Sequence, residues 1–141
     1  LAIHGIAMRP SSPTGMGMIG TTLVFLLPGN PVSCLAAYDF FAGRAIRAMG
    51  GWGTTWPYAP SQRKLVEKIA SAIGRVDYCR VVLDGPGVRP LSLSGASILS
   101  STTRADGFVV VPANLEGYPV GANVCVFRYD SVRSNWPSEI P

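Results

Sequence analysis

The run Pro28-Gly29-Asn30-Pro31, inside LLPGNPVSC, constrains the fold most because it separates two apolar segments of different period. Residues 21–27 before it are β-branched and apolar, which is typical of a fully buried strand in a parallel sheet covered on both faces. Residues 31–49 after it have apolar side chains at helical spacing, and Gly50-Gly51 is a stop signal. The pattern predicts a strand, a tight turn and an amphipathic helix.

The same turn has the residues of a helix start that could hold an anion. Asn30 is a favoured N-cap, Pro31 suits the first helical turn, and Ser33 can supply a hydroxyl. Free backbone N–H groups and the positive end of the helix dipole attract anions when the helix start is open to solvent. Taken alone, a strand-turn-helix of this kind is more often a capped turn without a ligand.

Composition limits the class of protein. With 48% hydrophobic residues and only 14% charged ones, the 141-residue chain should bury a core of its own. The net charge of +4 comes from scattered Lys and Arg, so no nucleic-acid partner is expected. No apolar run is long enough to span a bilayer and no signal peptide is recognisable, so we expect a cytoplasmic protein without a membrane partner. The chain starts with Leu in the middle of an apparent element, which suggests a piece of a longer protein.

The three cysteines, Cys34, Cys79 and Cys125, are widely spaced, and the one histidine is His4. No CxxC motif or second histidine completes a metal site, so we expect buried free thiols and no metal ligands in this chain.

The stretch GGWGTTWPYAPSQ has no hydrophobic period, and it is the best candidate for a domain boundary, with its two tryptophans packed between the halves. Short strand-like runs follow it at 78–83, 107–111 and 123–129, separated by turn residues, and predict a small all-β sandwich or barrel. The segment KLVEKIASAIGR repeats Leu65, Ile69 and Ile73 every four residues, which taken alone favours a helix.

Four motifs in the same order resemble the molybdopterin molybdotransferase family, which includes the C-terminal portion of gephyrin. VFLLPGNPVSCLAAYDFF resembles its PGNPVS strand-turn-helix signature, and IAMRPSSPTGMG its VAM(K/R/Q)PGKPxxFG segment. GRVDYCRV resembles GRxEFxRV, and SGASILSSTTRADGFVVVP resembles GSGxLSSLxxADGLxxLP. The resemblance covers about residues 3 to 128, and four collinear motifs are far more specific than one.

The resemblance implies an α/β part followed by an all-β part. Residues 1–52 would be the C-terminal half of a molybdopterin-binding α/β domain, and 62–130 a small, barrel-like C-terminal β domain. Residues 53–61 would be a linker and 131–141 a flexible tail. The segment before GRVDYCRV would be an edge strand rather than a helix.

The implied activity is that of a transferase of molybdenum cofactor biosynthesis, with this piece alone inactive. Molybdate would be inserted into the dithiolene of molybdopterin, delivered as adenylylated molybdopterin, with the help of Mg²⁺ whose acidic ligands precede this chain. Such chemistry needs anion-binding groups rather than a nucleophile, so no catalytic side chain is assigned. The full-length protein would be a homodimer.

The resemblance also implies binding residues. The molybdopterin pocket would be lined by Pro28, Gly29, Asn30, Pro31 and Ser33. Candidates for contact with molybdate or another oxyanion are Arg9, Arg75, Arg80, Ser94 and Ser97. At two positions where the family often carries lysine, this chain has Gly5 and Ser12.

Other interpretations remain open. Arg75 and Arg80 could be surface ion-pair partners, and Ser94 and Ser97 could be turn hydroxyls. The whole chain could be a non-catalytic molybdopterin-binding or scaffold module that keeps the fold. A barrel that binds single-stranded nucleic acid is less favoured, because the aromatic residues are not interleaved with basic ones.

Overall fold

The computed structural model describes residues 2–91 and 104–132, and these form mostly strands with one helical segment. The strands are β1 Ile3–His4, β2 Met8–Arg9, β3 Gly15–Ile19, β4 Thr22–Leu26, β5 Tyr58–Leu65, β6 Ile69–Ala70, β7 Val76–Asp84, β8 Gly87–Pro90, β9 Gly107–Val111, β10 Gly117–Tyr118 and β11 Asn123–Val132. The helical segment is α1 Pro31–Ala37, η1 Tyr38–Ala42 and α2 Gly43–Met49. The predicted helix over 31–49 and the three predicted strands are therefore confirmed.

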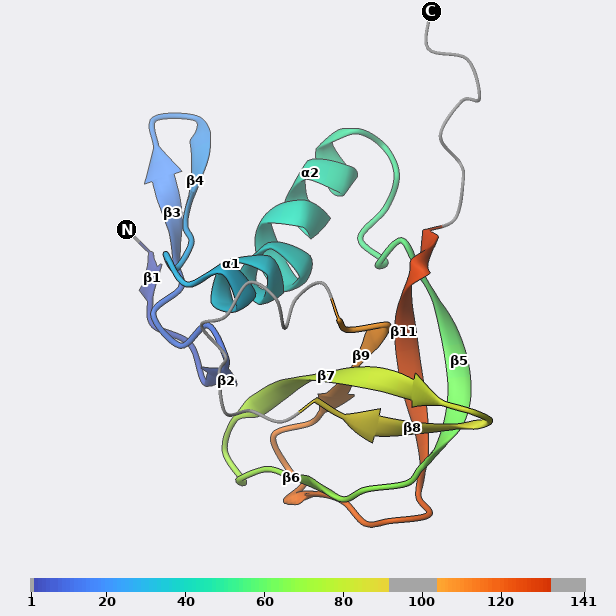
Figure 1. Cartoon of the computed structure of the whole chain (residues 1–141). Helices are drawn as coiled ribbons and strands as arrows, with labels where there is room; N and C mark the ends of the chain where they lie inside the picture. Colours follow the sequence, from blue (N-terminus) through green and yellow to red (C-terminus); the bar gives the residue numbers. More distant parts are fainter. Residues whose placement is uncertain (1, 92–103, 133–141) are drawn as a thin grey trace, which may run out of the picture.

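The largest sheet has the order β2-β7-β8-β5-β11-β9, and β9 also pairs with β7. That last pairing closes five strands into a ring, with β2 attached to β7 in parallel. The helical segment lies on one side of this ring (Figure 1). Because closure pairs the strands at both sides, the ring has few exposed edges.

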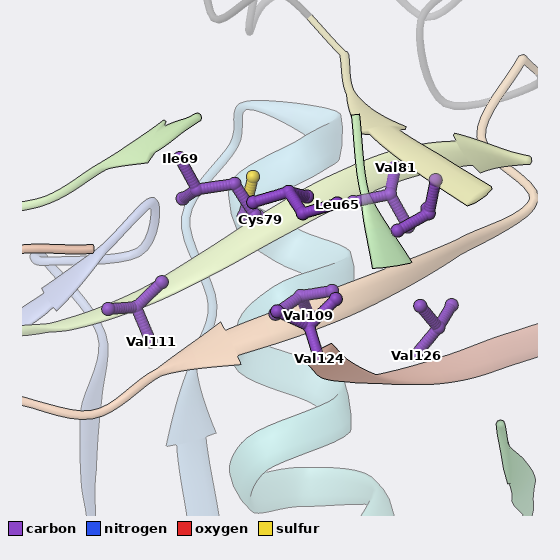
Figure 2. Packing of buried hydrophobic residues seen from close by; sticks show 9 residues of the cluster. Leu65, Ile69, Cys79, Val81, Val109, Val111, Val124 and Val126 are labelled. Atoms are coloured by element: carbon purple, nitrogen blue, oxygen red, sulfur yellow. The ribbon is translucent and has the colours of Figure 1, made fainter. Parts of the chain in front are cut away.

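The inside of the ring holds one hydrophobic cluster, drawn in Figure 2. Its members come from β5, β6, β7, β8, β9 and β11, and they are mostly valine: Leu65, Ile69, Cys79, Val81, Val88, Val109, Val111, Val124 and Val126. On β7, Cys79 and Val81 point into this cluster, so the alternate residues Tyr78 and Arg80 point to the other face.

A second cluster joins the helical segment to the ring. Tyr78 and Phe108 from the ring pack with Ala36 of α1, and Trp56 lies among them. The Trp56 ring is 5.0 Å from that of Phe40 and 4.8 Å from that of Phe127, between centroids. Trp56 thus packs between the two halves as predicted, whereas Trp52 is 47% exposed and does not.

The strand predicted at residues 21–27 forms as β4, but the prediction that it is buried on both faces and parallel to its neighbours was wrong. β4 pairs antiparallel with β3 in the sheet β1-β3-β4, and its residues are half-buried or exposed. Gly20 and Thr21 form the two-residue turn of this hairpin. The first residue of such a turn needs a positive φ, which glycine adopts easily, and Gly20 has φ +59°. A short apolar run between turn residues fits a hairpin strand as well as a buried parallel one.

The helix predicted by KLVEKIASAIGR was also wrong. Leu65 ends β5 and Ile69 begins β6, which pairs with β10, so the edge-strand interpretation holds for this part of the segment. Leu65 and Ile69 are buried in the ring, but Ile73 is 67% exposed. The four-residue spacing therefore did not mark one helical face.

The predicted domain limits remain a prediction. β5 begins at Tyr58, inside the range assigned to the linker, and β11 continues through Val132, two residues into the range assigned to the tail. The second hydrophobic cluster also takes residues from both predicted domains, so the two parts pack against each other.

Candidate functional site

The start of α1 is capped as its sequence predicts. The Oδ1 atom of Asn30 accepts from the backbone N–H groups of Val32 and Ser33, at 3.2 and 3.4 Å. The Cys34 N–H donates to the Asn30 carbonyl at 2.8 Å. Pro31 has no N–H, and the N–H groups of the next three residues already have acceptors. The helix start could therefore attract an anion through its dipole, but not through free N–H donors of these residues.

A π-helical stretch in the middle of the helical segment turns one carboxylate toward the ring. In η1, Asp39 is 7% exposed and lies in a segment otherwise made of aromatic and small residues. Its Oδ1 accepts from the Tyr58 hydroxyl at 2.8 Å, and its Oδ2 accepts from the Tyr78 hydroxyl at 3.0 Å. Such π-stretches are often found at functional sites.

A third tyrosine extends this network. The hydroxyls of Tyr78 and Tyr129 lie 2.5 Å apart, which connects β7 with β11. Burial raises the pKa of Asp39, while the hydrogen bonds from Tyr58 and Tyr78 act to lower it. Burial also raises the pKa of Tyr129 to about 12, and it raises the pKa of Tyr58 and Tyr78 further, so all three hydroxyls keep their protons at neutral pH.

The network forms one wall of a cavity of about 280 Å³ between the helical segment and the ring. We call it the Asp39–Arg80 cavity, and its lining residues are Val32, Leu35, Asp39, Tyr58, Tyr78, Arg80, Ala105 and Tyr129. Arg80 is 6% exposed and brings a permanent positive charge to the wall. The cavity thus combines a guanidinium, a carboxylate and three phenolic hydroxyls with apolar sides.

Two of the predicted elements meet at this cavity. Arg80 of the GRVDYCRV motif lines it directly, and the PGNPVS segment reaches it through Val32. Arg80 is 6% exposed, so it does not lie at the surface as the alternative supposed. Val32 was not itself a predicted ligand, and the described lining includes none of the predicted molybdopterin-binding residues, which are Pro28, Gly29, Asn30, Pro31 and Ser33.

The other two predicted arginines meet elsewhere. Arg9 and Arg75 both form ion pairs with Asp77, at 2.5 and 3.0 Å. Asp77 is 3% exposed, and Arg9 and Asp77 line a separate cavity of about 210 Å³. The ion-pair interpretation of Arg75 thus agrees with the structure. Both guanidinium groups already face a carboxylate, so they are weaker candidates for an external anion.

The predicted oxyanion ligands Ser94 and Ser97 lie outside the described residues. The cysteines are free thiols, but only Cys79 is buried; Cys34 and Cys125 are half-buried, so that part of the prediction was wrong for two of them. Burial raises the pKa of the Cys79 thiol to about 11. Within residues 2–91 and 104–132, no three His, Cys, Asp or Glu side chains are grouped so that they could hold a metal ion.

The sequence did not reveal the carboxylate and tyrosine network. Tyr58, Tyr78 and Tyr129 are spread over 72 positions and come together only through strand pairing. The signal that existed was Asp39, a lone carboxylate inside the otherwise apolar AAYDFFA. A buried acidic residue needs hydrogen-bond donors, so it predicts a polar network nearby.

Comparisons with known proteins agree with the resemblance. Residues 62–129 match the sequence-family model described as MoeA C-terminal region (domain IV). A molybdopterin biosynthesis protein of Methanocaldococcus jannaschii is 34% identical over 125 residues, which are 89% of this chain and 29% of that protein. Molybdopterin molybdenumtransferase 1 of Mycobacterium tuberculosis is 33% identical over 132 residues, covering 86% of this chain and 31% of that protein.

Solved structures give the same result. The molybdopterin biosynthesis MoeA protein of Pyrococcus horikoshii matches with a TM-score of 0.80 and 27% identity, over 91% of this chain and 32% of that one. A molybdenum cofactor biosynthesis protein of Pyrococcus furiosus matches with a TM-score of 0.79 and 27% identity, over 91% of this chain and 45% of that one.

No helix among the described residues is both long and apolar enough to cross a membrane. The chain spans about a third of the length of the curated relatives that it matches. The matching part includes the C-terminal region that the family model describes, and the fold is shared over nine-tenths of the chain. The predicted resemblance is confirmed: the chain is similar over nine-tenths of its length to MoeA-type molybdopterin biosynthesis proteins, and residues 62–129 match the C-terminal region of that family.

Proposed function

We propose that this chain takes part in inserting molybdate into molybdopterin, and that its Asp39–Arg80 cavity holds the molybdate or another oxyanion of that reaction. The observation that carries the proposal is the position of Arg80. Its side chain is buried, and it lines the same cavity as Val32 and Leu35 from the first turns of α1. The two motifs that imply this activity thus meet at one cavity.

The physical properties of the cavity suit a small oxyanion. A guanidinium presents up to five N–H donors in a fixed plane, and its charge interacts more strongly in a buried site than in water. The positive end of the α1 dipole lies near Val32 and adds to the favourable field. A volume of about 280 Å³ can contain a tetrahedral oxyanion together with part of a larger substrate.

Other parts of the proposed reaction rest on the family resemblance. We include adenylylated molybdopterin as the second substrate, a homodimer as the assembly and the cytoplasm as the location. Mg²⁺ does not fit the described residues, since they contain no group of side chains that could hold a metal ion. Its ligands are expected outside this chain.

The test is equilibrium binding of sodium molybdate to the chain and to two variants. Arg80→Gln keeps a polar side chain but removes the charge, so binding should weaken at least about tenfold. Arg63→Gln removes a charge from β5, where the Arg63 Nε donates to the Ser61 hydroxyl at 3.1 Å, and should bind as the original chain does. Equal binding by all three proteins would refute the cavity assignment. A folded chain that binds neither molybdate nor molybdopterin would favour the scaffold alternative.

A further inference from the structure

A chain of two hydrogen bonds runs from Asp39 through Tyr78 to Tyr129, and the protonation state of Asp39 decides which group donates in each bond. Tyr78 has a single hydroxyl proton, which it donates to Oδ2 of Asp39 at 3.0 Å. The 2.5 Å contact between Tyr78 and Tyr129 must therefore have Tyr129 as its donor. With Asp39 ionised, the Tyr129 oxygen can offer only lone pairs to the cavity, and lone pairs repel an oxyanion.

Protonation of Asp39 reverses this chain without moving a heavy atom. The new carboxyl proton on Oδ2 is donated to the Tyr78 oxygen, and Tyr78 then donates to Tyr129. The Tyr129 proton becomes available at the cavity wall. The balance is one proton taken from solvent onto Asp39, with each tyrosine keeping one proton throughout.

We propose that an oxyanion entering the Asp39–Arg80 cavity brings one proton onto Asp39 and that Tyr129 then donates a hydrogen bond to the bound oxyanion. This inference rests on the proposed function, in which the cavity binds molybdate. Tyr78 stands where the GRxEFxRV motif has Phe, so the link between Asp39 and Tyr129 depends on a hydroxyl that the motif does not supply.

The charged and titratable groups around Asp39 agree with this coupling. Tyr58 from β5 holds Oδ1 at 2.8 Å and so does not compete with the chain that starts at Oδ2. Burial raises the pKa of Asp39 above its ordinary value of 3.8, which makes proton uptake easier than for an exposed carboxylate. At Tyr129 the charge of Asp39 raises the pKa and the charge of Arg80 lowers it, so Tyr129 lies within reach of both charges.

The remaining neighbours do not supply a competing proton. Tyr78 from β7 and Tyr129 from β11 have pKa values raised by burial, so they stay protonated over the range of the experiment. Tyr38 precedes Asp39 on the helical segment, and this residue is 42% exposed. Among the described groups that line this cavity, Asp39 is therefore the one placed to take up a proton.

The experiment is calorimetric titration with sodium molybdate between pH 6 and 8, in two buffers of different ionisation enthalpy. For the original chain we expect close to one proton taken up per molybdate bound at the upper end of this range. The association constant should fall as pH rises, approaching about tenfold per pH unit.

Asp39→Asn gives the sharpest comparison. Its amide oxygen can still accept from Tyr58, and its amide N–H can donate to the Tyr78 oxygen, so the chain is fixed in the direction that makes Tyr129 a donor. This variant should bind molybdate at pH 8 at least as tightly as the original chain, with no proton uptake at Asp39. Tyr129→Phe should bind about tenfold more weakly, because the donor is lost.

Tyr118→Phe is the matched control. The Tyr118 hydroxyl donates to the Val110 carbonyl at 3.4 Å, away from this cavity, and its loss should leave both affinity and proton uptake unchanged. Binding by the original chain without proton uptake, or unchanged uptake in Asp39→Asn, would overturn the inference while leaving molybdate binding intact. Failure of the original chain to bind molybdate would contradict the proposed function together with the inference.

Discussion

The Tyr78 hydroxyl donates a 3.0 Å hydrogen bond to Oδ2 of Asp39, although 39 positions separate the two residues in the chain. Both side chains are buried, at 3% and 7% exposure. The bond joins β7 of the ring to the middle of the helical segment, beside the second hydrophobic cluster. A contact that binds the two halves together also forms the wall of the candidate site.

Removing this bond should destabilise the fold. Tyr78→Phe keeps the stacked contact with Phe108, whose ring centroid is 4.3 Å away, but removes a donor from a buried carboxylate. We expect the free energy of unfolding to fall by about 1–3 kcal/mol, measured by urea denaturation. Tyr118→Phe should cost less than about 1 kcal/mol, since its 3.4 Å bond is long. If the free energy of unfolding fell equally in the two variants, the bond to Asp39 would contribute no more to stability than the long bond of Tyr118.

The raised pKa of Asp39 predicts a stability that depends on pH. Burial raises the folded-state pKa above the ordinary value of 3.8, so the folded protein binds this proton more strongly than the unfolded chain does. The contribution is present in full below pH 3.8 and is lost as pH rises through the folded-state pKa. The stability of Asp39→Asn relative to the original chain should therefore increase over that interval. A difference that stays constant with pH, measured by thermal unfolding, would argue against the raised pKa.

The cap at the start of α1 predicts different effects for two substitutions of Asn30. Asn30→Ala leaves the Val32 and Ser33 N–H groups without their acceptor, so stability should fall by about 1 kcal/mol. Asn30→Asp keeps an acceptor and adds a negative charge that the helix dipole favours, so stability should be kept or rise slightly. The same negative charge should weaken molybdate binding. Unfolding midpoints of the two variants report the effect on the helix cap, and their molybdate affinities report the effect on binding.

Two glycines make a matched pair for the packing of the ring. A Cβ at Gly107 on β9 would collide with the carbonyl oxygen of Phe127 on β11, whereas a Cβ at Gly29 meets nothing within 4 Å. Gly107→Ala must push the two strands apart and should cost about 1–3 kcal/mol. Gly29→Ala should be nearly neutral. Similar unfolding midpoints for the two variants would contradict the close strand approach.

Local patterns predicted the parts of the fold that depend on neighbouring residues. The helix over 31–49, the Asn30 cap and the strand at 107–111 follow from period and capping, which act within a few residues. The hairpin of β3 and β4 was missed because an apolar run does not say which strand it will pair with. The KLVEKIASAIGR segment was misread for the same reason, since pairing with the distant strand β10 and not local preference fixes β6.

The candidate site was predicted in part. The resemblance singled out Arg80, but also Arg9 and Arg75, and the structure separates these arginines because Asp77 holds the last two. Nothing near Arg80 in the sequence indicates Asp39 or Tyr129. These residues converge because β7 and β11 both pair with β9, and because residues on alternate positions of β7 face the helical segment.

The most direct test of the central claim is a crystal structure of the chain with sodium tungstate, a strong anomalous scatterer of the same shape and charge as molybdate. We predict an anomalous peak inside the Asp39–Arg80 cavity, within hydrogen-bond distance of the Arg80 guanidinium and the Tyr129 hydroxyl. A peak beside Arg9, or bound tungstate only on the outer surface while this cavity stays empty, would contradict the account.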